Sequence, residues 1–175
     1  MNEYLLLLII ITIIAIISLV TIICLTNLKK YKEIITISEE EINKSLDTKM
    51  AIICDINNEI KKVVKDKDYL EEYLKIKDTN VSSIEKDIKL NEAEELINKL
   101  LVDYEKANNS KTKKHLGELR KTNEKLTSSK NLFNKHASKN NALIKKFPYN
   151  IVSKVFNYKI KSYYTTNKNE DSENF

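Results

Sequence analysis

The sequence predicts an all-α protein in which an N-terminal transmembrane helix is followed by an antiparallel bundle of three to four long helices. Three observations lead to this prediction. The 175 residues include one glycine and one proline, a long apolar segment lies near the N-terminus, and apolar residues then recur every three or four positions. Hairpin turns and phosphate-binding loops need glycines that this chain does not have. Sheets and nucleotide-binding folds are therefore disfavoured.

The first predicted element is an apolar segment, residues 5–25, in which 18 of 21 side chains are apolar. At about 1.5 Å per residue it reaches about 31 Å, enough to cross the hydrocarbon core of a bilayer. A signal peptide would need a basic start, a shorter apolar run and a small-residue cleavage site. A lipoprotein would need a small residue before Cys24, where Ile23 stands. We therefore expect an uncleaved anchor over residues 5–28, preceded by a stub, residues 1–4.

The charges beside this segment predict its orientation. No Lys or Arg precedes the segment, whereas Lys29, Lys30 and Lys32 follow it closely. The positive-inside rule places residues 29–175 in the cytoplasm and the N-terminus outside. Cys54 is the one cysteine of the soluble part, so no disulfide is expected there. The sequence therefore predicts a single-pass protein of the cell membrane with a cytoplasmic C-terminal domain.

A helical stripe follows from residue 29 to about residue 64. Its apolar members are Ile35, Ile42, Leu46, Met50, Ile53, Ile56, Ile60 and Val63. No residue between positions 27 and 30 breaks a helix, so the membrane helix can continue directly into this one. The helix either ends at residues 65–68 or runs on through residues 69–76.

A second stripe begins after the turn residues 78–80, with Ser82 or Ser83 as a helix cap and Glu85 behind it. Its members are Ile84, Ile88, Leu96, Ile97, Leu100, Leu101 and Tyr104. The Asn-Asn-Ser run at residues 108–110 predicts a loop before the last long helix.

The last long helix carries a seven-residue repeat, which predicts a seam of the coiled-coil type. One row contains Leu119, Leu126, Phe133, Asn140 and Phe147, and the companion row contains Leu116, Asn123, Lys130, Ala137 and Ile144. Pro148 is expected to end this helix because it lacks an N–H group. The bundle then spans residues 29–150, an apolar and basic segment spans residues 151–164, and a disordered tail spans residues 165–175.

Charge is divided unevenly along the soluble part. Residues 29–105 hold 14 Lys or Arg and 19 Asp or Glu, whereas residues 106–175 hold 16 and 5. Pairing of acidic with basic helices in a bundle would absorb part of this difference. The remaining positive charge of residues 106–175 favours a basic face that binds anionic lipid or an acidic partner. Nucleic acid is disfavoured, because the domain is tethered to a membrane and carries no recognition motif.

The sequence shows no catalytic, cofactor-binding or metal-binding constellation, and we expect a non-enzyme with none of these sites. His115 and His136 lie 21 residues apart on one predicted helix, about 31 Å, which is too far to share a metal or a substrate. Cys54 lies on an apolar stripe without a neighbouring histidine in the sequence. A pocket that brought Cys54 to either histidine would reopen the enzymatic alternative.

The region around residues 119–158 resembles the signature of the LemA family, E-N-x-I…A-R-x-x-Y-N…Y-N…F-P-S-N…F-G-F. The residues that carry the motif here are Leu119, Leu126, Phe133, Asn134, Asn141, Phe147, Pro148, Asn150 and Phe156. Upstream, residues 46–61 resemble the family's Q-L-x-R-R-x-D-L-I-P-N-L-V stretch, and Tyr104 resembles the tyrosine of its A-Y-P turn. Thr48 and Cys54 depart from that pattern. The chain is therefore identified as a divergent member.

The resemblance implies a cytoplasmic bundle of long helices behind one anchor and no established enzymatic activity, and some relatives organise membrane compartments. We therefore expect a scaffold or adaptor that contacts the bilayer through residues 5–28 and binds an unidentified protein or itself. The alternatives are engagement of anionic lipid by the basic C-terminal half, or regulation of a membrane enzyme. Phe147 and Phe156 are expected to pack on the end of the bundle, with a basic-aromatic strip on the membrane surface as the alternative.

Overall fold

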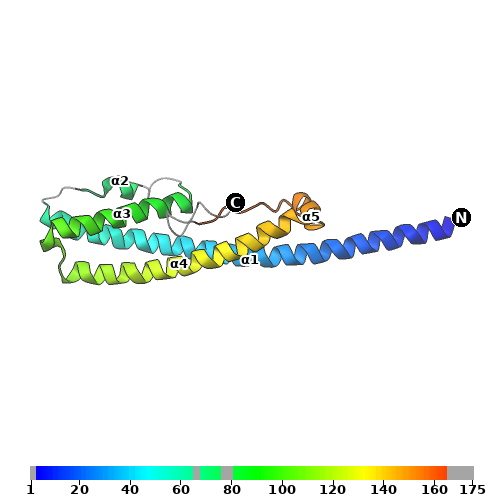
Figure 1. The fold of residues 1–175 in the computed structure, drawn as a ribbon, viewed down its shortest axis with the longest axis horizontal. Helices are drawn as coiled ribbons and strands as arrows, with labels where there is room; N and C mark the ends of the chain where they lie inside the picture. Colours follow the sequence, from blue (N-terminus) through cyan, green and yellow to red (C-terminus); the bar gives the residue numbers. More distant parts are fainter. Residues whose placement is uncertain (1–2, 65–67, 76–80, 165–175) are drawn as a thin grey trace. The chain divides into compact units, whose positions relative to one another are not determined.

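The computed structural model describes residues 3–64, 68–75 and 81–164, and it is helical along most of these ranges (Figure 1). The elements are α1 (Glu3–Val63), α2 (Glu71–Leu74), α3 (Ser83–Asp103), the 3-10 helix η2 (Glu105–Ala107), α4 (Ser110–Lys145) and α5 (Tyr149–Val155). The described ranges contain no strand, so the predicted all-α class is confirmed. The predicted tail, residues 165–175, and the turn residues 78–80 lie outside the described residues.

The chain forms two compact units, and α1 and α4 contribute to both of them. Unit 1 consists of residues 3–37 and residues 132–164, and unit 2 lies within residues 38–131. Unit 1 therefore contains the first part of α1, the end of α4 and the whole of α5. Unit 2 contains the rest of α1, α2, α3, η2 and the start of α4.

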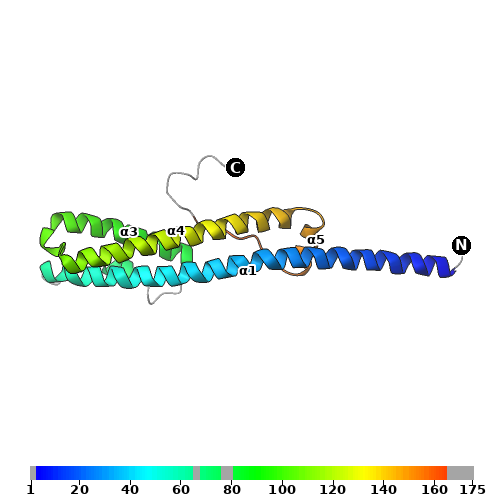
Figure 2. The same cartoon turned by 90° about the horizontal axis from the view of Figure 1, so that it is seen from below.

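In unit 2, α1 and α3 run in the same direction. Asn43 of α1 contacts Ser83 at the start of α3, and Lys49 donates a hydrogen bond to Asn91, further along both helices. Helix α2 lies between α1 and α3 in the chain, and Figures 1 and 2 show α3 beside the second half of α1.

Helix α4 runs antiparallel to both of these helices. On α1, Glu41 pairs with Lys125 and Glu59 accepts a hydrogen bond from Asn109. On α3, the pairs are Asp87 with Lys130 and Glu94 with Asn123. The expected antiparallel arrangement therefore describes α4, while α1 and α3 are parallel to each other.

The apolar stripe predicted for α1 is buried along the part of the helix that follows the apolar segment. Its members from Ile35 to Ile60 are all buried, and Val63 is half-buried. Burying each of these side chains contributes about 1.5–3 kcal/mol, so this stripe is a main source of the stability of the bundle.

The stripe predicted for α3 needs one correction. Ile88 is exposed, and the buried positions of the helix are Asp87, Leu90, Ala93, Ile97, Leu100 and Leu101. The period is helical, but the buried face is turned so that Asp87 points inward. The physical reason is the ion pair of Asp87 with Lys130, which places a carboxylate where an apolar side chain was expected.

The start of α3 and the start of α4 follow the predicted signals. Ser82 caps α3, because its hydroxyl accepts a hydrogen bond from the Glu85 N–H at 3.2 Å. After η2, the side chain of Asn109 accepts a hydrogen bond from the Thr112 N–H at 3.0 Å and so caps α4. These two helix starts thus rest on short polar side chains rather than on glycine.

The first part of α1 is long and apolar enough to cross a membrane. Its most apolar 18-residue window has a mean hydropathy of 3.3, and none of it is buried. Thr12, Ser18 and Thr21 each donate a hydroxyl hydrogen bond to a carbonyl of the preceding turn of the same helix. The polar atoms of this segment are therefore satisfied within the helix itself, as an apolar environment requires.

Candidate functional site

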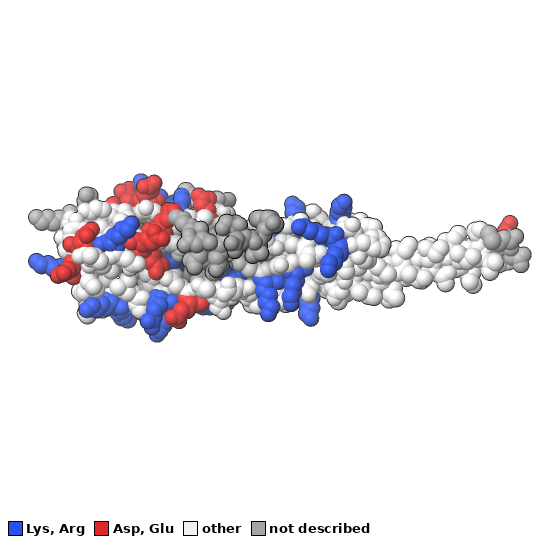
Figure 3. All heavy atoms as spheres, viewed as in Figure 1, with Lys and Arg blue, Asp and Glu red and all other residues white. Residues whose placement is uncertain are grey.

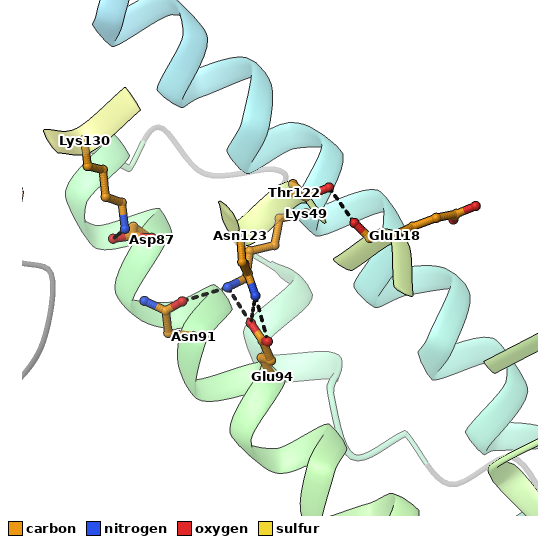
Figure 4. Close-up of polar contacts among 8 residues, drawn as sticks. All are labelled: Lys49, Asp87, Asn91, Glu94, Glu118, Thr122, Asn123 and Lys130. Carbon is orange, nitrogen blue, oxygen red and sulfur yellow. Dashed lines mark hydrogen bonds and ion pairs between the residues drawn. The ribbon is translucent and has the colours of Figure 1, made fainter. Parts of the chain in front are cut away.

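A partly buried polar layer, centred on the buried Lys49, joins the three long helices of unit 2 (Figure 4). Lys49 of α1, with a side chain 1 % exposed, contacts Glu94 Oε2 at 2.6 Å and Asn91 Oδ1 at 2.7 Å, both on α3. Asn123 of α4 donates to both oxygens of the same Glu94 carboxylate, at 2.8 and 3.0 Å. The Glu94 carboxylate is therefore shared between a cation and an amide from two different helices.

A second buried contact lies between α3 and α4. Lys130 Nζ is 2.5 Å from Asp87 Oδ2, and both side chains are 7 % exposed. The other oxygen, Asp87 Oδ1, is buried without a hydrogen-bond partner among the described residues. Ion pairs of this kind fix which faces of two helices meet, while the cost of removing water from both charges limits their net contribution to stability.

Polar contacts also tie the connections of unit 2 to its helices. Tyr104, the position that resembles the family's A-Y-P tyrosine, has its hydroxyl 2.9 Å from that of Tyr69. This hydrogen bond raises the pKa of Tyr104 above its ordinary value. Asp68 accepts one hydrogen bond from Asn57 and pairs with Lys61. Burial raises the pKa of Asp68, but the hydrogen bonds from Lys61 and Asn57 lower it by more, so the net shift of the pKa is downward.

A pocket of about 270 Å³ lies between α1 and α4 in unit 2. Its walls are formed by Lys44, Ser45, Thr48, Lys121, Thr122 and Lys125. This pocket contains neither Cys54 nor either histidine, so it does not supply the arrangement that would reopen the enzymatic alternative. His115 lies 3.3 Å from Glu118 on its own helix. In the described ranges, no group of three or more His, Cys, Asp or Glu side chains could hold a metal ion.

Two asparagines of the motif bind the C-terminal segment of unit 1. Asn134 Nδ2 donates to the Tyr164 carbonyl at 2.6 Å, and Asn134 Oδ1 accepts from the Tyr164 N–H at 2.9 Å. Asn141 repeats this arrangement with Lys161, at 2.8 and 2.9 Å. Each amide therefore satisfies both backbone groups of one residue, as a neighbouring strand would.

The spacing of these asparagines matches the geometry of the segment that they bind. Seven residues on a helix rise about 10.5 Å, and three residues of extended chain span about 10 Å. Asn134 and Asn141 are seven apart, and their partners Tyr164 and Lys161 are three apart and in reverse order. The segment thus runs back along α4, where the Tyr164 ring also packs edge-on against Phe133, with centroids 5.0 Å apart.

Helix α5 packs against α1 where the apolar segment of α1 ends (Figures 1 and 2). Val152 forms a buried cluster with Cys24 and Leu28 of α1. Two further contacts join the same parts of the chain. Asn27 Nδ2 donates to the Tyr149 hydroxyl at 2.8 Å, and Lys32 Nζ lies over the Tyr158 ring, 5.6 Å from its centroid. Three different kinds of contact therefore fasten residues 149–158 to residues 24–32.

His136 lies in unit 1 with its ring 6.0 Å from that of Tyr31, centroid to centroid. Its Nδ1 is buried without a hydrogen-bond partner among the described residues. Burial lowers the pKa of His136, and the charges of Lys139, Lys135 and Lys30 lower it further. His136 is therefore neutral at pH 7 and acts as a packing residue.

The two units differ strongly in charge. Residues 29–37 and 132–164 of unit 1 hold ten lysines and one acidic residue, Glu33, whereas residues 38–131 hold 19 Lys or Arg and 20 Asp or Glu. Figure 3 shows the lysines of unit 1 gathered next to the uncharged stretch of α1, and both signs intermixed on unit 2. The pairing of opposite charges expected for the bundle therefore applies to unit 2, and the surplus positive charge belongs to unit 1.

The motif residues predicted from the sequence have different places in the structure. Leu119, Leu126 and Phe133 are buried on α4, and Asn140 of the same heptad row is buried too. Asn134 and Asn141 bind the C-terminal segment. Pro148 is the residue before α5, and Asn150 lies in its first turn.

The expectation that Phe147 and Phe156 pack on the end of the bundle is wrong. Phe147 is 78 % exposed and Phe156 is 49 % exposed. Helix α4 ends at Lys145, two residues too early to direct Phe147 into the seam, and α5 buries Val152 and Ser153 instead of the aromatic residue that follows it.

Sequence reasoning also missed the residues that complete unit 1. Tyr164 is buried, and so are Cys24 and Val152, but none of the three belongs to a stripe or a repeat. The seven-residue spacing of Asn134 and Asn141 was the available signal. It could have been interpreted as a pair of backbone-binding amides on one helix face, although it could not have identified the residues that they bind.

One comparison with known proteins finds a match. The model of the LemA family matches residues 38–174, which is most of the chain. A search of curated proteins and a search of solved structures find no match. The matched residues include the polar layer of unit 2, the asparagines that bind the C-terminal segment, and α5. The chain belongs to the LemA family.

Proposed function

We propose that this LemA-family protein is a single-pass membrane protein that holds a non-enzymatic helical scaffold or adaptor at the cytoplasmic face of the membrane. One observation carries the proposal. Helix α1 is unburied and apolar over its first part, yet the same unbroken helix supplies the buried residues from Ile42 to Ile60. The proposed anchor and the core residues of the bundle therefore belong to one helix, with no loop between them. This arrangement favours a scaffold that binds a partner on its surface over an enzyme that converts a substrate.

The surface of unit 2 indicates where such a partner would bind. In its described residues, the exposed large apolar side chains are Ile88 and Val102, both on α3. They lie 14 residues apart, close to four helical turns, and so face nearly the same way. The heptad seam of α4 is already buried within the chain, which makes the outer face of α3 the better candidate for a protein contact.

In-membrane photocrosslinking of the full chain tests this proposal. A photoreactive amino acid at Val102 should yield a discrete crosslinked product, to another protein or to a second copy, that the exposed position Lys121 on α4 does not yield. Mass spectrometry would identify the product. Equal yields of diffuse product from both positions would contradict a defined partner on α3.

Orientation is tested separately with a protease added to intact cells. The lysines that follow the apolar segment support a cytoplasmic C-terminal domain. Residues 29–175 should then be protected until the membrane is permeabilised. Cleavage of this domain in intact cells would place it on the outside.

A second candidate function is electrostatic engagement of anionic lipid by unit 1, which the ten lysines of its soluble part favour. Each basic residue near an anionic surface contributes about 1 kcal/mol, and salt screens the attraction. In nanodiscs that contain the full chain, anionic lipid should slow the acetylation of Lys135 and Lys139. The control residues, Lys113 and Lys114 on the same helix but in unit 2, should react at unchanged rates. Slowing that persists at about 1 M salt, or that is equal in both units, would count against this function.

A further inference from the structure

Helix α5 is held at a level of α1 that corresponds to the end of a bilayer crossing. The apolar segment ends at residue 25, and its first following charge is Lys29. Val152 packs on Cys24 and Leu28, and Tyr149 accepts its hydrogen bond from Asn27. The contacts therefore fall within the last turn of the apolar segment and the first turn beyond it.

The outer side of α5 is apolar and uncovered. Ile151 and Val155 lie four residues apart, which places them on one face of the helix, and they are 56 % and 72 % exposed. Phe147 precedes this face by four residues, and Phe156 adjoins it. Four large apolar side chains are thus gathered at one short helix, whereas the described part of unit 2 exposes two that stand apart.

Basic and aromatic residues border this apolar face. Lys145 and Lys146 precede it, and Lys154 and Lys159 lie within and after it. Tyr149 and Tyr158, both half-buried, stand between it and α1. Elements that lie in a bilayer interface have this composition: apolar side chains reach the acyl boundary, tyrosines lie at the headgroup level, and lysines reach anionic headgroups.

We propose that α5 is an interfacial membrane helix that inserts Phe147, Ile151 and Val155 into the cytoplasmic leaflet of the bilayer that α1 crosses. The proposal rests on the proposed crossing by α1. An interfacial helix buries its apolar face about 5–10 Å into the boundary between headgroups and acyl chains. An attachment at Cys24 and Leu28 is at that depth, because residues 5–25 span about 31 Å and fill the hydrocarbon core.

The bilayer is the occupant that these observations favour over a protein. A side chain near Cys24 lies beside acyl chains if α1 crosses the membrane, so lipid covers this level of the molecule without any further partner. The charged residues that border this face are all lysines, whose positive charge is complementary to anionic headgroups. Asn27 holds Tyr149 at the start of α5, and Lys32 holds Tyr158 just beyond its end, so both contacts keep the helix at this level of α1. An exposed apolar face at that level is covered by the acyl chains.

The chain contains no tryptophan, so a single introduced tryptophan reports on one position. The test uses the full chain in nanodiscs of phosphatidylcholine and phosphatidylglycerol, with and without brominated acyl chains that quench by contact. The variants V155W and V102W are matched, since both replace a valine that is more than 70 % exposed, the first on α5 and the second on α3. The brominated lipid should quench V155W and shift its emission to shorter wavelength, and it should leave V102W unchanged. F147W repeats the measurement at the exposed residue of the turn before α5.

A third variant separates this proposal from the crossing by α1. I14W places the tryptophan within the apolar segment, where quenching reports that α1 is inserted. Quenching of I14W without quenching of V155W and F147W would overturn the interfacial helix while leaving the anchor intact. Protection of V155W from aqueous acrylamide without quenching by lipid would assign the face to a protein contact and would also overturn the proposal.

Salt distinguishes insertion from electrostatic attachment. Contact of apolar side chains with acyl chains is not screened, so quenching of V155W should persist at about 1 M salt, where charges are screened beyond about 3 Å. A loss of quenching at that salt would mean that α5 only rests on the headgroups through its lysines. That result would overturn the insertion and leave the electrostatic function of unit 1 standing.

Discussion

Asn134 binds both backbone groups of Tyr164: its amide nitrogen donates to the Tyr164 carbonyl at 2.6 Å, and its amide oxygen accepts from the Tyr164 N–H at 2.9 Å. An uncharged amide can do both at once because its nitrogen donates and its oxygen accepts. Aspartate could accept but not donate, and leucine could do neither. This pair explains why an asparagine stands beside the buried Phe133 at this point of the motif.

Replacement of Asn134 should release the C-terminal segment. In Asn134→Asp, the carboxylate would face the Tyr164 carbonyl, and one hydrogen bond would be lost, at a cost of about 1–3 kcal/mol. The Tyr164 amide should then exchange with solvent faster, and trypsin should cleave sooner after Lys159 and Lys161. Hydrogen exchange with mass spectrometry measures the first effect. Asn131→Asp, at an exposed position of α4, is the control, and equal exchange in both variants would contradict the role of Asn134.

The buried pair of Asp87 and Lys130 predicts a non-additive pair of substitutions. Lys130→Met leaves the Asp87 carboxylate buried without its partner, which should cost about 3–5 kcal/mol of the free energy of unfolding. Combining it with Asp87→Leu should restore most of that loss, because the charge to be buried is gone. Urea unfolding followed by circular dichroism measures both values. Losses that simply add in the double variant would argue against direct coupling of these two residues.

The cap of α3 should be sensitive to Ser82. Ser82→Ala removes the acceptor for the Glu85 N–H and should lower the free energy of unfolding by about 1 kcal/mol. Ser82→Asp keeps an acceptor at the positive end of the helix and should retain the stability. The same unfolding measurement compares the two variants, and equal destabilisation by both would show that the cap contributes little.

Gly117 is a position where the helix can be strengthened. It lies inside α4, and a Cβ atom added there would meet no other atom within 4 Å. Gly117→Ala should therefore stabilise the protein by about 1 kcal/mol, since alanine has the higher helix propensity and fewer unfolded conformations. A higher midpoint of thermal unfolding is expected, and a lower one would mean that the position is crowded.

His136 should make the stability of unit 1 depend on pH. Its folded pKa is lowered from the ordinary value of 6.5 by burial and by Lys139, Lys135 and Lys30, so the unfolded chain binds the proton more tightly. Its contribution is therefore fully present above pH 6.5 and is lost as the pH falls below that value. His136→Gln should flatten this dependence in thermal unfolding between neutral and mildly acidic pH. A curve of unchanged slope would assign the effect to other groups.

Much of this architecture is predictable because it depends on local order in the sequence. The hydropathy of residues 5–25, the stripe from Ile35 to Ile60 and the cap at Ser82 each involve residues within a few turns of one another. The period of the last helix likewise placed Leu119, Leu126 and Phe133 in the core. In these cases the physics that forms the element, burial of one face and satisfaction of the first N–H groups, acts on neighbouring residues.

Contacts between distant residues were decided by the tertiary structure. Periodicity placed Ile88 inward on α3. Instead Asp87 faces inward, because it pairs with Lys130, which lies 43 positions further along the chain. The heptad row likewise pointed Phe147 into the seam, while the early end of α4 left it exposed. An ion pair or a chain reversal depends on which faces meet, and a repeat within one helix does not contain that information.

The sequence by itself determined an all-α chain of the LemA type, with one apolar helix, a long heptad helix and a surplus of lysine. Tertiary structure alone decided that the lysines surplus to charge pairing gather in unit 1, that Asn134 and Asn141 bind the backbone of Tyr164 and Lys161, and that α5 is fastened at Cys24. Helices follow from interactions between near neighbours. The place of α5 depends on Val152 meeting a residue 128 positions earlier, which only the folded chain brings together.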